Sequence, residues 1–146
     1  MKQSKNTFLI ISASLSALAA LFHLACIVFG APMYLLMGAG SQMAHLAEIG
    51  HWYPTVVTSC IASILFIWSL YALSGGGVIR RLPLLRFALC AITTIYLVRS
   101  VAFLPLMSYF PENSPSFWFW SSSICFVIGL MYLMGTWQVW AKLKSN

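Results

Sequence analysis

Arg99 is the residue whose type and setting most strongly suggest chemistry, because it is a single cation inside an apolar run, residues 87–107. A charged side chain near the middle of a membrane-spanning helix costs about 2.5 to 3.5 kcal/mol on insertion scales, so it usually has a partner or a task. A guanidinium group can bind a carboxylate or a phosphate through two parallel hydrogen bonds. We therefore expect Arg99 to bind an anionic ligand or lipid phosphate, or to be satisfied structurally by a glutamate or the lipid headgroups.

One further polar side chain, that of His23, is expected at the level of Arg99, and that of Tyr96 is expected one helical turn below it. At 1.5 Å per helical residue, Arg99 lies about 12 Å below the outer end of its run, and His23 about 10 Å below the same end of the first run. Tyr96 lies one turn from Arg99 on the same side of the helix. His23 could bind a ligand, handle a proton or take part in hydrogen-bonded packing. Pro105 is expected to kink the outer end of the third run.

The charge of Arg99 has few candidate partners, because Glu48 and Glu112 are the only acids in the sequence. Glu48 shares one face of a predicted short helix with His45. If this helix folds inward, the Glu48 carboxylate offsets the charge of Arg99, and such a pair is strongest at low dielectric. The predicted ligand-binding set therefore consists of Arg99, His23, Glu48, Tyr96 and His45.

The sequence contains no recognisable nucleophile motif, phosphate-binding loop or HExxH motif. We therefore assign no catalytic residue, and an enzyme that uses His23 or Glu48 as general acid or base on an apolar substrate is kept as an alternative. His45 and His51 are six residues apart in one loop, and His23 is the only histidine inside an apolar run. Neither a metal site nor a bound cofactor is expected.

The four cysteines fall one in each apolar run and include no CxxC pair. Each is interpreted as a small residue that packs between helices. Cys26, Cys60 and Cys125 are all expected in the outer half of the bundle. A disulfide among them stays open, because the sequence does not supply the geometry.

The composition indicates a membrane protein: 61% of the residues are hydrophobic and 7% are charged. A soluble domain carries about 25% charged residues, so this chain could not cover a surface that faces water. The formal charge of +6 is spread over the ends of the apolar runs rather than clustered on one face. This distribution argues against a nucleic-acid partner.

Four apolar runs, at about residues 8–30, 54–74, 87–107 and 117–141, each approach or exceed the ~20 residues that cross a bilayer as a helix. We predict a single all-α domain over residues 1–146, an up-down-up-down bundle of four transmembrane helices. The basic residues that flank the runs on one side are Lys2, Lys5, Arg80, Arg81, Arg86, Lys142 and Lys144. By the positive-inside rule, both termini are cytoplasmic, in what we take to be a bacterial inner membrane. Small residues at helical spacing predict the packed faces: Ser12, Ser16, Ala19 or Ala20, His23, Cys26 and Gly30; Thr58, Ala62 and Ser69; Ser121, Cys125 and Gly129.

The loop at residues 31–53 is long and stays apolar. Pro32 can start a helical turn, and the glycines at 38 and 40 interrupt it. Ser41 is expected to be an N-cap and Gly50 a stop, which predicts a short helix over residues 42–49 at the outer membrane interface. This helix is either a lid over the bundle or a passive cap on the helix ends.

The N-terminus also resembles a secretory signal, with Ala17-Leu18-Ala19 as a cleavage site, but the apolar run continues to Gly30. We therefore favour an uncleaved first span.

The favoured function is a small membrane protein with a polar pocket in the outer half of the bundle, which binds a membrane lipid or a small anionic amphiphile. It could act as an accessory subunit or as a homo-oligomer. The alternatives are the acid/base enzyme and a structural or immunity-type subunit, without a ligand, that binds a partner membrane protein.

Overall fold

The computed structural model describes residues 5–144, and the regular elements there are all helices. They are α1 (Thr7–Phe29), α2 (Ala31–Leu36), α3 (Ser41–Glu48), α4 (Trp52–Gly75), α5 (Leu85–Val101), α6 (Phe103–Tyr109) and α7 (Pro115–Lys144). Helices α1, α4 and α7 are each long and apolar enough to cross a membrane, and α5 and α6 pass the same test together as a bent pair. The chain is thus an all-helical integral membrane protein with three or four candidate membrane-spanning helices. The predicted basic flank at Lys2 lies outside the described residues.

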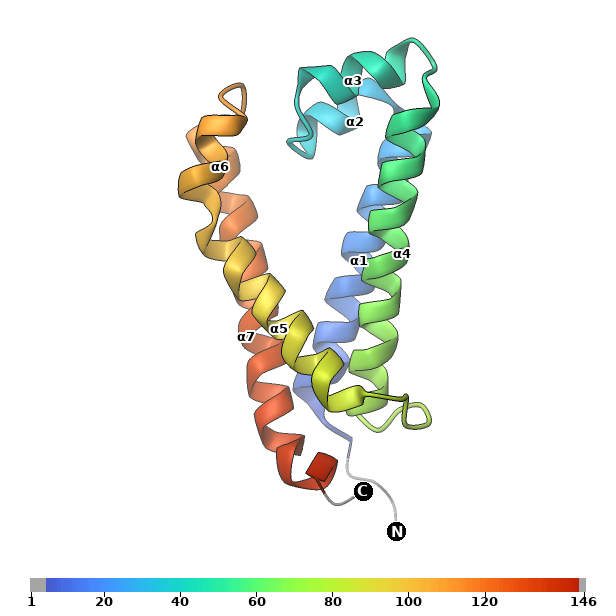
Figure 1. Cartoon of the computed structure of the whole chain (residues 1–146), viewed down its shortest axis with the longest axis vertical. Coiled ribbons are helices and arrows are strands. Elements are labelled where there is room, and N and C mark those ends of the chain that lie inside the picture. Colours follow the sequence, from blue (N-terminus) through green and yellow to red (C-terminus); the bar gives the residue numbers. More distant parts are fainter. Residues whose placement is uncertain (1–4, 145–146) are drawn as a thin grey trace.

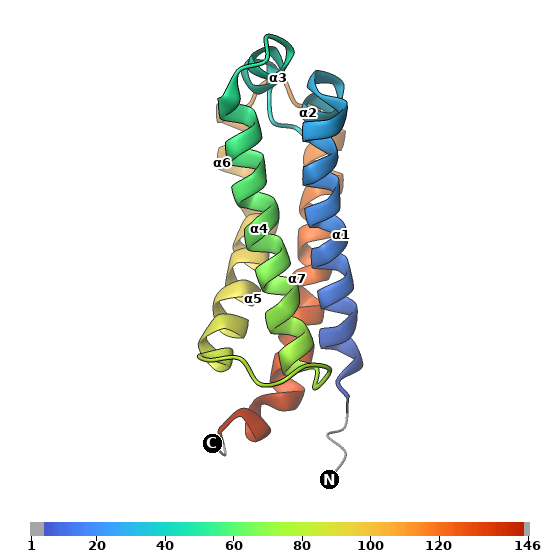
Figure 2. The same ribbon diagram turned by 90° about the vertical axis from the view of Figure 1, so that its right-hand side faces the viewer.

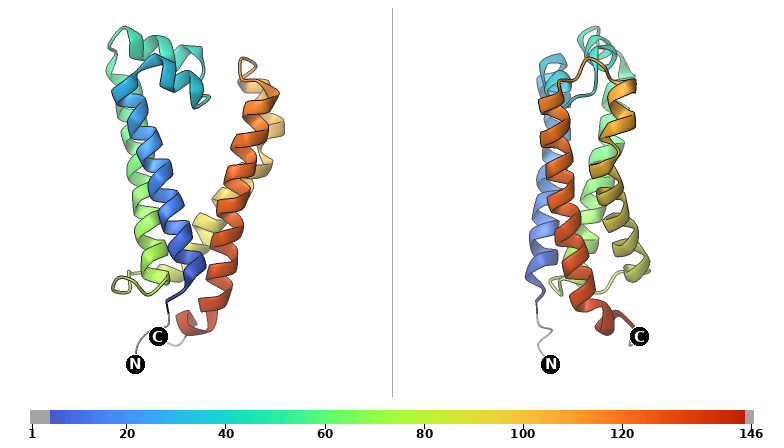
Figure 3. Two further views of the ribbon diagram at one scale, coloured as in Figure 1. Left: turned by 180° about the vertical axis from the view of Figure 1, so that it is seen from behind. Right: turned by 90° about the vertical axis from the view of Figure 1, so that its left-hand side faces the viewer.

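The helices form two arms that meet where α1 begins and α7 ends and diverge toward the opposite end (Figure 1). The first arm consists of α1 and α4, with α2 and α3 lying across their far end. The second arm consists of α5, α6 and α7. Side views show the long helices of each arm lying side by side (Figures 2 and 3), and α1 with α4 and α5 with α7 form the most extensive helix interfaces. We call the two ends of the molecule the terminal end and the α3 end.

The arms share a hydrophobic core at the terminal end, where Leu9, Leu89 and Tyr132 have no exposed surface. One serine hydroxyl joins three helices there: Ser16 Oγ of α1 lies 3.0 Å from the Tyr96 hydroxyl of α5 and 2.9 Å from the Tyr132 hydroxyl of α7. The predicted small-residue face of α4 is confirmed, because Thr58, Ala62 and Ser69 are buried. The predicted faces of α1 and α7 are confirmed in part. They are buried at Ser12, Ser16, Ala20, Cys26 and Gly129 and only half-buried at His23, Gly30, Ser121 and Cys125.

A separate and smaller core lies at the α3 end and belongs to the first arm alone. It is built from Cys26, Tyr34 and Ala44, of α1, α2 and α3. The Thr58 hydroxyl of α4 donates to the Tyr34 hydroxyl at 3.1 Å. The two hydrophobic cores are therefore not continuous, and the arms have separate interiors at this end.

The third apolar run was predicted as one helix with a kink, and the structure breaks it. Helix α5 ends at Val101, α6 begins at Phe103, and their axes differ by 62°. Pro105 explains the position of the break, because proline has no N–H and its ring clashes with the carbonyl four residues earlier, here that of Val101. The predicted kink at Pro105 is thus confirmed, and it is larger than expected, because it divides the run into two helices.

The predicted short helix in the first long loop exists as α3, one residue earlier than expected. The N-cap position is Gly40, with a φ of 87°, and Ser41 is the first helical residue. The prediction of Ser41 as the N-cap is therefore wrong. The Glu112 carboxylate, from the loop between α6 and α7, accepts from the Ser41 backbone N–H and supplies the missing cap. Gly50, with a φ of 70°, follows the end of α3 as expected.

Candidate functional site

Arg99 lies near the end of α5, half-buried, and turns toward α7. Its Nη2 donates to Ser121 Oγ at 3.0 Å, and its Cζ lies 5.6 Å from the centre of a Trp118 ring. Its Nη1 is buried and has no hydrogen-bond partner. The contacts of this cation are therefore with neutral groups, a hydroxyl and an aromatic ring.

Neither glutamate compensates the charge of Arg99 in the described part of the chain. Glu48 is exposed on α3 and forms no ion pair with Arg99. Glu112 is bound to Ser41 through both carboxylate oxygens. The hypothesis that an inward-folded Glu48 offsets the arginine is thus not realised in this structure.

Two more buried donors near Arg99 lack partners. They are Trp118 Nε1 and Ser122 Oγ of α7, whose side chains are 3% and 8% exposed. Roughly 90% of buried polar groups in proteins are hydrogen-bonded, so each exception needs an explanation. Within residues 5–144 the remaining exceptions, Arg86 Nε and Thr136 Oγ1, belong to the terminal half of the second arm. We call Arg99, Trp118 and Ser122 the donor patch, because each has a buried N–H or O–H group without a hydrogen-bond partner.

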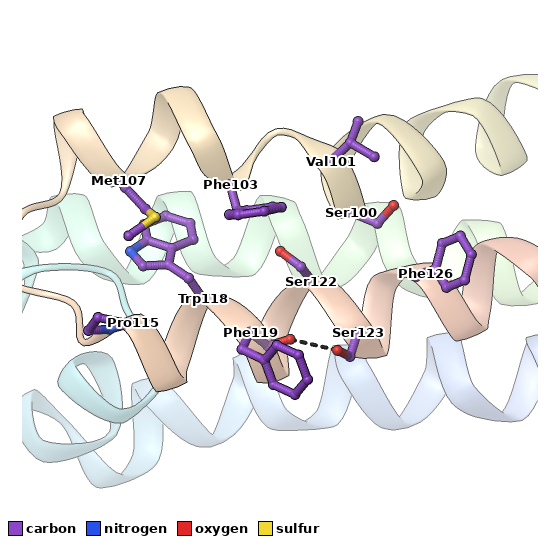
Figure 4. Close-up of a pocket in the computed structure, with 10 residues that line it drawn as sticks. All are labelled: Ser100, Val101, Phe103, Met107, Pro115, Trp118, Phe119, Ser122, Ser123 and Phe126. Carbon is purple, nitrogen blue, oxygen red and sulfur yellow. Dashed lines mark hydrogen bonds between the residues drawn. The ribbon is translucent and has the colours of Figure 1, made fainter.

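An apolar groove of about 600 Å³ lies beside the donor patch, on the side where α6 bends away from α5. Figure 4 shows the side chains that line it, among them Val101 of α5, Phe103 and Met107 of α6, and Trp118, Phe119 and Phe126 of α7. The volume falls within the range of about 300–1,000 Å³ typical of sites for small ligands. The groove thus lies at the break between α5 and α6, with both helices contributing to its wall.

The serine hydroxyls around the groove differ in their bonding. Ser100 Oγ donates to the Leu97 carbonyl at 2.6 Å, and Ser123 Oγ donates to the Phe119 carbonyl at 2.7 Å (Figure 4). Both donors are therefore satisfied inside their own helices. Ser122 is the serine of this wall whose hydroxyl is left without a partner.

The other predicted site residues lie apart from the donor patch. Tyr96 is 6% exposed and belongs to the shared core, where its ring stacks on that of Tyr132. His23 is on the first arm, and its Nδ1 lies 2.8 Å from the Ala19 carbonyl of the same helix. His45 and Glu48 are exposed on α3. Of the predicted set, Arg99 is the one residue that the structure brings to the unpartnered donors.

Sequence reasoning did not assign Trp118, Ser121 or Ser122 to the site. Trp118 was interpreted as part of an interfacial aromatic belt, and Ser121 as a packing residue. A usable signal was present, because the three serines at 121–123 lie about 6–9 Å below the outer end of the fourth run, within reach of the long Arg99 side chain about 12 Å below the outer end of the third.

A second set of contacts joins the two arms at the α3 end. Glu112 Oε2 accepts from Ser41 N at 2.8 Å, and Glu112 Oε1 accepts from Ser41 Oγ at 2.7 Å. Asn113 Nδ2 donates to the Gly38 carbonyl at 3.0 Å, and the Phe117 ring packs directly on Gly38. We call these five residues the clasp. The two hydrogen bonds from Ser41 lower the pKa of the Glu112 carboxyl below its ordinary range.

The cysteines and the possible metal-ligating side chains are distributed as follows. All four cysteines, at 26, 60, 90 and 125, are free, so no disulfide links the helices. Among the residues that the structure describes, no group of three or more His, Cys, Asp or Glu side chains could hold a metal ion.

Comparison with protein-family models, with curated proteins and with solved structures found no match to this chain.

Proposed function

We propose that the chain crosses a bacterial inner membrane four times, with α5 and α6 together as one broken span and both termini cytoplasmic. The support is the distribution of charge over the described residues. Lys5, Arg80, Arg81, Arg86 and Lys142 lie near the terminal end, whereas both glutamates lie in the connections at the α3 end. Basic residues are retained on the cytoplasmic side, which puts α3 at the outer surface.

The proposed function is the binding of an anionic amphiphile, a lipid or a fatty acid, by the second arm. One observation carries it: Arg99 has a buried Nη1 without a partner and no carboxylate to compensate its charge. A carboxylate or phosphate headgroup supplies the acceptor that Arg99, Trp118 and Ser122 lack. The apolar groove takes the hydrocarbon part of the same molecule.

Native mass spectrometry of the protein in mild detergent tests this function, with oleate as the probe and oleyl alcohol as its uncharged analogue. We expect the protein to retain oleate and not oleyl alcohol. A hydrogen bond to a charged group contributes about 1.5–3 kcal/mol, so Arg99→Ala should weaken oleate binding about 10- to 150-fold.

Arg86→Ala is the matched control, because Arg86 also stacks on a tryptophan, with its Cζ 4.6 Å from the Trp140 ring. This variant should retain oleate like the wild type. Equal retention by Arg99→Ala would refute the proposal. A co-purified protein chain without bound lipid would instead support the structural subunit, and turnover that depends on His23 or Glu48 would support the enzyme.

A further inference from the structure

Helix α6 forms a movable wall of the groove. Phe103 and Met107 of α6 line it opposite α7. No residue of α6 is buried, so few apolar contacts hold this helix in place. It is joined to α5 by the break at Ala102 and to α7 by the loop that carries Glu112. A short helix between two interruptions can turn as a unit about its ends.

The clasp holds the far end of this wall. Glu112 follows the end of α6 at Tyr109 by three residues. At the α3 end of the described chain, three hydrogen bonds cross between the arms. Ser41 donates two of them to the Glu112 carboxylate, and Asn113 donates the third to the Gly38 carbonyl. The separate core of the first arm does not extend to α6. The position of α6 therefore depends on the clasp.

The donor patch is closed in this arrangement. Trp118 Nε1, Ser122 Oγ and Arg99 Nη1 each have almost no accessible surface, although the groove beside them is open. A headgroup can reach these donors only if a wall of the site moves. The wall made by α7 belongs to the shared core through Tyr132, whereas α6 has no such anchor.

We propose that the clasp is a latch on the groove: release of Glu112 from Ser41 lets α6 turn about Ala102, away from α7, and opens the donor patch to the amphiphile. This inference rests on the proposed function, since it describes the regulation of the same site. The cleft around Glu112 is also lined by Tyr53 and Tyr109, and no lysine, arginine or histidine of the described chain lines it. No basic side chain in the cleft therefore competes with Ser41 for the carboxylate.

The latch is tested by measuring the position of α6 and the exchange of ligand together. Spin labels at Gln42 of α3 and Ser108 of α6, both exposed, report the distance across the clasp in a background without native cysteines. The exchange of bound oleate for isotopically labelled oleate is followed by native mass spectrometry. Glu112→Ala should lengthen and broaden the distance distribution and speed exchange about tenfold, the order expected for the loss of a hydrogen-bonded contact.

Glu48→Gln is the matched control, because Glu48 is the other acid at this end and is exposed on α3, outside the clasp. It should leave both the distance and the exchange rate unchanged. If Glu112→Ala does not fold, Ser41→Ala removes one of the two side-chain bonds and should shift both measurements in the same direction by less.

The outcomes separate the latch from the function. A wild-type protein that retains no oleate refutes the proposed function, while the label distance still reports whether the clasp holds α6. If oleate binds and Glu112→Ala leaves both the distance and the exchange rate as in the wild type, the latch is wrong and the function stands. A longer distance with unchanged exchange also overturns the latch, because α6 would then move without controlling access.

Discussion

Replacing Gly38 by alanine should damage the clasp more than its small size suggests. Gly38 has a φ of 72°, and the ring of Phe117 already fills the position that a Cβ would take. The left-handed conformation costs an L-residue about 1–2 kcal/mol. Displacing a packed ring adds the cost of overpacking, about 1–3 kcal/mol. Gly38→Ala should therefore lower the free energy of unfolding by about 2–5 kcal/mol.

Gly50→Ala supplies the control for backbone strain. Gly50 has a nearly equal φ of 70°, but no atom lies within 4 Å of the position of its added Cβ. Gly50→Ala should therefore lower the free energy of unfolding only by the cost of the left-handed conformation, about 1–2 kcal/mol. The assay is equilibrium unfolding in mixed detergent micelles, followed by the loss of helical circular dichroism.

A double-mutant cycle assigns the remaining difference to the aromatic contact. In a Phe117→Ala background, the cost of Gly38→Ala should fall to that of Gly50→Ala. Equal costs for the two glycine variants in the wild-type background would refute the argument, because they would mean that Phe117 yields without loss and that the clasp does not constrain the loop.

Two further outcomes follow from the hydrogen bonds. The pKa of the Glu112 carboxyl is lower in the folded protein than its ordinary value of about 4.3. The contribution of the clasp to stability is therefore complete at neutral pH and declines as the pH falls below that value. The label distance across the clasp should lengthen in that range and should not change with pH in Glu112→Gln. Ser16→Ala should cost about 1–3 kcal/mol in the unfolding assay, since it leaves the buried Tyr96 hydroxyl without its partner. Ser14→Ala is the control, because its hydroxyl is exposed and bonded within its own helix, and it should change the free energy of unfolding by less than about 0.5 kcal/mol. Equal losses for Ser16→Ala and Ser14→Ala would contradict a stabilising role for the Ser16 hydrogen bonds.

The helices were predictable because they depend on local properties of the chain. Runs of apolar residues located α1, α4 and α7, and small residues at helical spacing located the buried faces of α1 and α4. The effect of Pro105 was also predictable, since a proline acts on the carbonyl four residues before it. The size of the resulting break was not, because it depends on how α6 packs against α7.

The partners of the charged residues were not predictable, because they depend on how the arms are arranged in space. The sequence offered only Glu48 and Glu112 as counter-charges for Arg99. The interpretation favoured Glu48, because its short helix could fold inward, whereas Glu112 is the one that binds across the arms, to Ser41. Arg99 was singled out correctly as unusual. Its neighbours Trp118 and Ser121 were missed because they lie 19 and 22 residues further along the chain, on a different helix.

Each arm is built from one continuous stretch of the chain, residues 7–75 for the first and 85–144 for the second. Contacts within an arm therefore form without closing a loop that spans the whole protein, and such local contacts form fastest. The first half can become a packed helical hairpin before the second half has left the ribosome. The hydrogen bonds between the Ser16 hydroxyl and the hydroxyls of Tyr96 and Tyr132 then form only when the second hairpin docks on the first. Assembly in the membrane thus reduces to the association of two preformed halves, and the segment between Gly75 and Leu85 is the place where the chain could be cut without dividing either one.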